Sequence, residues 1–383
     1  MAEVEMDHLV KRFPNGRYVV ADLSLTVADG EFVALLGPSG SGKSAVLEMV
    51  AGLEDITRGE LRFDGEVVTE TPPWERDVAV VFQSPALYPH LTVAQNIAFP
   101  LRLAGTGRTE SATLVRETAD LLGISAHLDR LPGTLAAGQR QRVAIGKTLV
   151  RHPKVLLMDE PVANLDVRLR GQMRSLIGDL HTKFCTTTIY VTQDHTEAMA
   201  LSDRVVVLRD GVVQQVGTPT ELDTRPLNLF VAELVGDAAM NLLPATLEGE
   251  SVVSGLGTFA LPPAVRRASE RSPGNEVVLG IRPGDLELVG SDEDEALVVS
   301  VQLDDVVSVG SQTTLHFTVP NRGAPSPRSL PPGFSVPVAG TAATARISGP
   351  CSERAGSRVR LRVDLARLQI FDSGSGLNLS APP

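Results

Sequence analysis

A glycine-rich loop is the part of this sequence best suited to binding a phosphate group. It consists of Gly37, Pro38, Ser39, Gly40, Ser41, Gly42, Lys43 and Ser44. Glycines let backbone N–H groups converge on phosphate oxygens, and a helix that begins after the loop adds its positive end. The pattern predicts that Lys43 neutralises the β- and γ-phosphates of a nucleotide and that the Ser44 hydroxyl binds Mg²⁺.

Two adjacent carboxylates further along the chain could complete this chemistry. Asp159 and Glu160 follow the apolar run 155–158, which is typical of a buried strand. Such a pair could simply cap a helix, but downstream of a phosphate loop it indicates hydrolysis. We expect Asp159 to orient Mg²⁺ through its water shell and Glu160 to act as the general base toward a water molecule.

The elements that must position these residues alternate along the chain. Apolar runs at 31–36, 78–82, 155–159, 187–192 and 204–208 predict strands of a sheet that is covered on both faces. Helical periodicity predicts helices after the loop, at 109–123, at 138–151 and around 169–180. Strands that alternate with helices indicate an α/β domain.

The pattern changes after about residue 236. Short apolar runs at 276–281, 296–303, 313–319 and 358–365 are separated by turn residues, which favours a small β barrel. Residues 321–333 have the composition of a loop. A chain of 383 residues therefore reads as two domains, of which the second is rich in β structure.

Composition excludes several classes of protein. A net charge of −11 without a basic cluster argues against nucleic acid as a partner. Cys185 and Cys351 lack the spacing of a metal site, and two distant cysteines do not suggest a disulfide framework. We find neither a secretory signal nor an uncharged run of about 18 residues, so any membrane role is expected to be peripheral, through protein partners.

Further segments, in this order and spacing, resemble ABC transporter ATPases. Gln83 in VFQSPALYPHLTV resembles the lid glutamine that reaches Mg²⁺ and the attacking water, and Phe13 stands where an aromatic ring contacts adenine. LAAGQRQRVAIGK, with Ala136, Gly138 and Gln139, resembles the signature. ANLD, which ends at Asp166, resembles the loop that crosses the dimer interface, and YVTQDHTEAM, with Gln193, resembles the switch segment.

The resemblance implies an ABC-type P-loop NTPase fold in residues 1–236, with an inserted helical subdomain at about 88–152. It implies ATP and Mg²⁺ as cofactors and a dimer of ATP-binding subunits, identical or different. Membrane permease subunits would be direct partners, and a substrate-binding protein an indirect one. We expect a peripheral protein on the cytoplasmic face of the plasma membrane.

Within the family, the tract VGTPTELDTRPLNLFVAELVG, followed by Met240, resembles the sugar-importer branch with maltose-type subunits. LGIRPGDL resembles the start of that branch's OB-like, TOBE-type regulatory domain, here 237–383, although Gly284 replaces the usual Glu. Importers of polyamines, iron or phosphodiesters share this layout. The expected function is coupling of ATP hydrolysis to uptake of a small solute, such as a sugar or sugar derivative.

Five positions depart from the family at contacts that should matter: Ala45, Ala136, Ala137, Ala163 and Gln193 replace Thr, Ser, Gly, Ser and His respectively. Because Ala136 removes a donor to the γ-phosphate and Gln193 cannot carry a positive charge, we expect slow hydrolysis. An alternative is a nucleotide-dependent gate or scaffold with vestigial ATPase activity. A third reading, a soluble ABC protein of DNA repair or translation, is disfavoured by the acidic charge and the importer-like second domain.

Overall fold

The computed structural model describes residues 2–236, 239–261, 275–289, 297–320, 340–349 and 351–381. The chain divides into two compact units, Met1–Pro219 and Thr220–Pro383. This division comes before residue 236, where the sequence pattern changes. The reason is helix α8 (Leu229–Leu234), because its Leu229 and Ala232 pack with Val278 and Phe371 of the second unit.

The first unit contains two sheets and six α-helices. Its strands are β1 (Val4–Arg12), β2 (Tyr18–Val27), β3 (Phe32–Leu36), β4 (Arg58–Phe63), β5 (Glu66–Val67), β6 (Val78–Val81), β7 (Val155–Asp159), β8 (Thr187–Thr192), β9 (Arg204–Arg209) and β10 (Val212–Gly217). Its helices are α1 (Lys43–Ala51), α2 (Val93–Leu103), α3 (Arg108–Leu121), α4 (Ala137–Leu149), α5 (Val167–Phe184) and α6 (His195–Leu201). Helix α7 (Pro219–Thr224) spans the division between the units.

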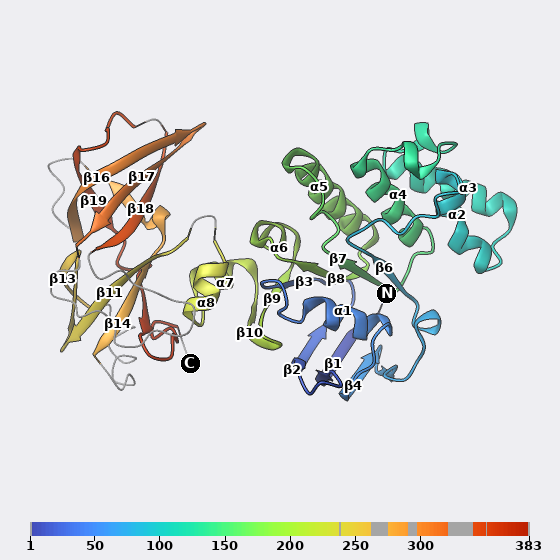
Figure 1. Cartoon of the computed structure of the whole chain (residues 1–383), viewed down its shortest axis with the longest axis horizontal. Helices are drawn as coiled ribbons and strands as arrows, with labels where there is room; N and C mark the ends of the chain where they lie inside the picture. The colour runs from blue at the N-terminus through green and yellow to red at the C-terminus, as the bar shows by residue number, and fades with distance from the viewer. Residues whose placement is uncertain are drawn as a thin grey trace. The chain divides into compact units, whose positions relative to one another are not determined.

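The central sheet has the strand order β10-β9-β3-β8-β7-β6, and all its pairs except β10 with β9 are parallel. Its five parallel strands are the five that the apolar runs predict. Every residue of β3 and β8 is buried. Helix α1 packs on one face and α5 on the other (Figure 1), which confirms the expected α/β fold.

Helices α2, α3 and α4 form the insertion between β6 and β7. Their apolar residues Ile97, Val115 and Val143 belong to one buried cluster. Helices α3 and α4 match the expected helices at 109–123 and 138–151, whereas α2 was not predicted, because Pro100 inside it reads as a helix breaker. All three helices lie within 88–152.

A second, antiparallel sheet, with the strand order β2-β1-β4-β5, was also missed. Strand β1 is bulged, and His8 in it has a φ of 51°. Its buried positions are therefore Val4, Met6, Leu9 and Lys11, and the bulge interrupts the alternation that identifies a strand in sequence.

The described residues of the second unit form two five-stranded antiparallel sheets, β13-β12-β11-β14-β20 and β15-β19-β16-β17-β18. The strands are β11 (Asn241–Glu248), β12 (Ser251–Ser254), β13 (Gly257–Ala260), β14 (Glu276–Ile281), β15 (Leu286–Leu288), β16 (Leu297–Val309), β17 (Gln312–Val319), β18 (Thr341–Ser348), β19 (Arg358–Val363) and β20 (Gln369–Asp372). One core is shared by both sheets, with Leu243 of β11 and Phe317 of β17 among its residues. This confirms the expected β-rich, OB-like unit.

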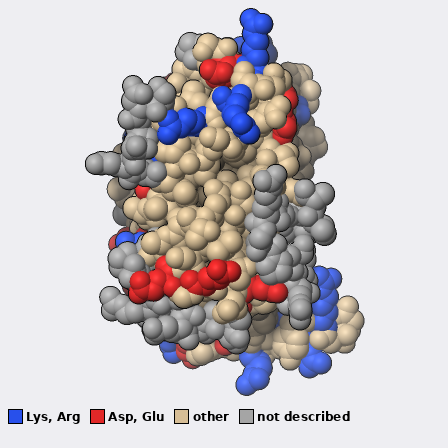
Figure 2. Space-filling model, turned by 90° about the vertical axis from the view of Figure 1, so that its left-hand side faces the viewer, with Lys and Arg blue, Asp and Glu red and all other residues tan. Residues whose placement is uncertain are grey.

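The four runs predicted as strands correspond to β14, β16, β17 and β19. In β19, Val359, Leu361 and Val363 are buried while the intervening arginines are not, as the period of two predicts. The expected loop at 321–333 lies outside the described residues. Figure 2 shows one face of this unit, where acidic side chains form a row below a neutral centre.

Candidate functional site

The strand order brings three functional segments to one edge of the central sheet. Strand β8 lies between β3 and β7, and all three are parallel. The phosphate loop follows β3, the acidic pair lies at the end of β7, and Gln193 follows β8. Ligands of open α/β sheets bind at this carboxyl edge.

The phosphate loop connects β3 to α1, and close packing requires glycine at two of its positions. A Cβ atom at Gly37 would lie 2.3 Å from the Leu208 carbonyl oxygen, and one at Gly42 would lie 2.4 Å from the Val19 carbonyl oxygen. Gly42 also has a φ of 101°, in the region that favours glycine, and it is the residue from which α1 begins. The N–H groups of the first turn of α1 are therefore directed into the loop.

Lys43 lies inside this loop. Its Nζ donates to the carbonyl oxygens of Gly37 at 2.9 Å and Pro38 at 2.8 Å, and the residue is buried. Burial lowers the pKa of Lys43, while the nearby charges of Glu160 and Asp159 act in the opposite direction. A partly desolvated ammonium group in a glycine cradle fits the recognition of a phosphate chain.

Ser44 and Asp159 lie in direct contact, with 3.1 Å between Ser44 Oγ and Asp159 Oδ1. Burial raises the pKa of Asp159, and the hydrogen bond from Ser44 opposes that shift. Within the described ranges, no group of three His, Cys, Asp or Glu side chains could hold a metal. One hydroxyl and one carboxylate nevertheless fit Mg²⁺, which proteins bind through few side chains together with substrate phosphates.

The expected general base and the switch residue also meet. Gln193 Nε2 donates to Glu160 Oε1 at 2.7 Å. Glu160 has a φ of 43°, uncommon for a residue with a side chain, and its backbone N–H donates to the Val191 carbonyl oxygen at 3.0 Å. Both side chains, with Ala163, line an open depression at the edge of the sheet.

Gln83 lies beside the loop expected at a dimer interface. Its carbonyl oxygen accepts from Asn164 Nδ2 at 3.5 Å, and its side chain is exposed. Asp166, in the same loop, is the N-cap of α5, since its Oδ1 accepts from the Leu169 N–H at 2.9 Å. For both residues, contact with a nucleotide or metal stays a prediction.

The signature residues make a separate cluster. Ala136 is the N-cap of α4, and its N–H donates to Gln139 Oε1 at 3.0 Å. Gln139 Nε2 lies 2.9 Å from Nε2 of His127, and Gly138 approaches Leu169. In the part of the chain that the structure describes, no hydrogen bond joins this cluster to the phosphate loop.

Phe13 and Ala45 are the two remaining predicted contacts. Phe13 is 39% exposed, which leaves its ring accessible to a base, and Lys11 Nζ lies 5.8 Å from the ring centre. Ala45 packs against the apolar cluster beneath the sheet. Sequence reasoning missed His127, because a polar residue whose contact lies elsewhere in the chain leaves no periodic signal.

Comparison with known proteins identifies the family of this chain. Residues 20–163 match the family model described as ABC transporter, and residues 239–286 match the MalK OB fold domain. Over its full length the chain is 47% identical to the trehalose import ATP-binding protein SugC of Mycobacterium tuberculosis, of which 99% is covered. It is 43% identical to the sulfoquinovosyl glycerol transport ATP-binding protein SmoE of Agrobacterium fabrum, with 97% of this chain and 98% of SmoE covered.

A third relative is the sn-glycerol-3-phosphate import ATP-binding protein UgpC of Chromohalobacter salexigens, at 40% identity, with 97% of this chain and 95% of that protein covered. Among solved structures, a dimeric ATP-binding cassette in a post-hydrolysis state with ADP and Pi matches with a TM-score of 0.52 and 28% identity. That match covers 56% of this chain and 98% of the solved one.

No described helix has both the length and the apolar character needed to span a membrane. The chain binds ATP and is an ATPase. The relatives match both units and extend over nearly the whole chain. This chain belongs to the ABC transporter ATP-binding proteins, and it combines their ATPase domain with an OB-fold domain of the MalK type.

Proposed function

We propose that this chain is the ATP-binding subunit of an importer for a sugar or sugar derivative. The pairing of Ser44 with Asp159 and of Glu160 with Gln193 beside Lys43 supports the ATP-binding role, and the relatives support the cargo. The relatives named above are import or transport subunits for trehalose, sulfoquinovosyl glycerol and sn-glycerol-3-phosphate. Each of these solutes is a sugar or a small polyol derivative.

The residues divide the work of hydrolysis among them. Lys43 and the backbone N–H groups of the loop bind the phosphates, and Ser44 and Asp159 would hold Mg²⁺, which neutralises phosphate charge when bound. Glu160 accepts the proton of the attacking water. Gln193 fixes the Glu160 carboxylate through its amide N–H, but it brings no positive charge to the transition state.

Each nucleotide site is completed by a second ATP-binding subunit, either an identical chain or a different one. The separate signature cluster favours this arrangement, because Gln139 is bonded to His127 and not to the phosphate loop of its own chain. The dimeric relative with ADP and Pi is in keeping with it. The subunit lies on the cytoplasmic face of the membrane, bound to permease subunits, and the substrate-binding protein acts on it only through them.

Cross-linking tests this placement. The segment around Leu87 is expected to contact the permease, so Ala86→Cys, in a chain whose own Cys185 and Cys351 are changed to Ser, should trap a membrane protein in native vesicles. A cysteine at the exposed Glu66 of β5 is the control and should trap none. Capture of no membrane protein through residue 86 would contradict the proposal.

Uptake tests the solute. Cells that carry the native chain or Lys43→Ala are supplied with labelled trehalose, sulfoquinovosyl glycerol or sn-glycerol-3-phosphate. We expect the variant to lose uptake of trehalose or sulfoquinovosyl glycerol, and a loss confined to sn-glycerol-3-phosphate would indicate a polyol phosphate as the cargo. Equal uptake of all three would count against a sugar or sugar derivative as the cargo.

Hydrolysis by this chain is slow, because Ala45, Ala136, Ala137 and Gln193 remove contacts from both halves of a shared site. The competing function is a nucleotide-dependent gate or scaffold with vestigial turnover. Steady-state ATP turnover with the permease present separates the two. Turnover stimulated by the transported solute supports the importer, and ATP binding without such turnover supports the gate.

A further inference from the structure

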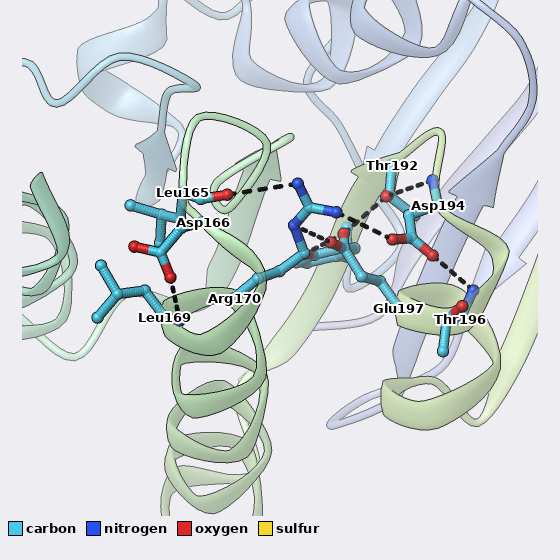
Figure 3. Close-up of polar contacts among 9 residues, drawn as sticks. Leu165, Asp166, Leu169, Arg170, Thr192, Asp194, Thr196 and Glu197 are labelled. Atoms are coloured by element: carbon cyan, nitrogen blue, oxygen red, sulfur yellow. Dashed lines mark hydrogen bonds and ion pairs between the residues drawn. The ribbon is translucent and has the colours of Figure 1, made fainter. Parts of the chain in front are cut away.

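An ion-pair network lies behind the switch residue, between α5 and α6. Arg170, on the first turn of α5, directs its guanidinium group toward the Leu165 carbonyl oxygen, Asp194 and Glu197 (Figure 3). Its Nη2 lies 3.4 Å from the Leu165 oxygen, its Nη1 3.5 Å from Asp194 Oδ2, and its Nε 3.9 Å from Glu197 Oε1. One side chain thus contacts the two segments that flank the open depression at the catalytic edge.

Glu197 is the buried anion of the network. Its side chain is 4% exposed, and its Oε2 accepts from the hydroxyls of Tyr190 at 3.0 Å and Thr192 at 2.7 Å. Burial raises the pKa of Glu197, while these hydrogen bonds and the Arg170 charge oppose the shift. A carboxylate in this position needs its cation, because a buried charge without a partner is strongly destabilising.

Asp194 links the network to the switch. Its Oδ1 accepts from the Thr196 N–H at 2.8 Å and so caps α6, while its Oδ2 faces Arg170. Its own N–H donates to the Thr192 hydroxyl at 2.9 Å. Gln193 therefore lies between two residues whose positions the network holds, and it bonds in turn to Glu160.

At its other end, Arg170 contacts Leu165, which belongs to the loop 163–166. We propose that Arg170 is a positioning residue that couples the loop 163–166 to Gln193 within one chain, so that docking of a second chain on the loop sets the Glu160–Gln193 pair. The inference rests on the proposed two-chain site. A planar guanidinium group holds its N–H donors in a fixed geometry, whereas a lysine ammonium group is a point charge on a flexible chain.

The test is a mutant cycle in the full-length chain, with ATP turnover and ATP affinity both measured. Arg170→Ala should lower kcat by about tenfold or more, since small displacements of catalytic groups are costly, and should change ATP affinity by less than about twofold. Asp194→Asn keeps the oxygen that caps α6 but removes the charge that faces Arg170. It should lower kcat in the same direction, and the double variant should be no slower than Arg170→Ala.

Arg168→Ala is the matched control, because Arg168 is an exposed arginine on the same first turn. It removes the same charge and should leave kcat unchanged. Arg170→Lys keeps the positive charge without the planar guanidinium group, so it should recover only part of the kcat that Arg170→Ala loses. If thermal unfolding shows that Arg170→Ala is not folded, Arg170→Lys takes its place in the cycle.

Three results would overturn the inference: an unchanged kcat in Arg170→Ala, additive effects in the double variant, or a fall in ATP affinity as large as the fall in kcat. Failure of the proposed function gives a different result. If the proposed function fails, the wild-type chain shows no ATP turnover that depends on Glu160. If only this inference fails, the wild-type chain turns over ATP and Glu160→Gln abolishes that turnover.

Discussion

Ala136→Ser should change both the stability and the activity of this chain, and the structure gives the size of each effect. Helix α2 begins with a complete capping box: Thr92 Oγ1 accepts from the Gln95 N–H at 3.2 Å, and Gln95 Oε1 accepts from the Thr92 N–H at 2.9 Å. Helix α4 has only half of this arrangement, since Gln139 Oε1 accepts from Ala136 but alanine has no hydroxyl to return a bond. Ala136 already has the extended backbone of an N-cap, with φ −66° and ψ 160°.

A serine at this position would complete the box without rearranging the backbone. An N-cap hydroxyl stabilises a protein by about 1 kcal/mol relative to alanine. For a domain of this size, that raises the midpoint of thermal unfolding by roughly 2 to 4 °C. The same hydroxyl would restore the donor that the family directs at the γ-phosphate, and a hydrogen bond to a charged group contributes about 1.5 to 3 kcal/mol. ATP turnover with the permease present should then rise between about tenfold and a hundredfold.

Thermal unfolding without nucleotide and ATP turnover at saturating ATP separate the two effects. Thr92→Ala should lower the unfolding midpoint by about the amount that Ala136→Ser raises it. Ala104→Ser adds an exposed hydroxyl at the C-terminal end of α2, where it cannot act as an N-cap, and should change neither quantity. An unchanged midpoint in Ala136→Ser would refute the capping argument. A raised midpoint with unchanged turnover would refute the missing phosphate donor.

Three further predictions concern the phosphates, the metal and the switch. Lys43→Ala should abolish Mg²⁺-dependent ATP binding in calorimetry, and equal affinity in both proteins would remove the basis of the nucleotide site. Mg²⁺ binds the ionised carboxylate, and burial raises the pKa of Asp159 above its usual 3.8, so Mg²⁺-dependent ATP affinity should weaken as the pH falls toward that raised value. In Asp159→Asn this affinity should be weaker and should depend less on pH. Identical pH profiles for the two proteins would contradict the role of Asp159. The combined reversion Ala136→Ser, Ala137→Gly and Gln193→His should raise turnover at least about tenfold, equivalent to roughly 1.4 kcal/mol, and no rise at unchanged ATP affinity would show that the chain compensates for the substitutions.

The sequence predicted correctly what depends on short contiguous segments. The five parallel strands are runs of apolar residues, and in β3 and β8 every residue is buried, as that composition predicts. Strand β1 escaped prediction because a bulge at His8 breaks its alternation, and α2 escaped because of Pro100. In both cases tertiary packing outweighs a local signal.

The site residues that are neighbours in sequence could likewise be proposed from the sequence. Glycines at 37, 40 and 42 with Lys43 form a phosphate loop by themselves, because the cradle is made of their own backbone. Asp166 illustrates the limit of motif reading. The structure uses its carboxylate to cap α5, and the motif does not reveal that role.

What the sequence alone determined is therefore the set of parts: a phosphate loop, an acidic pair, a switch segment and a second, β-rich domain. Only the tertiary structure decided which parts meet. Ser44 and Asp159 are 115 residues apart in the chain, and Gln193 and Glu160 are 33 apart. They become neighbours because β8 lies between β3 and β7. That strand order results from the pairing of distant segments and the packing of helices on both faces, and no local pattern of residues records it.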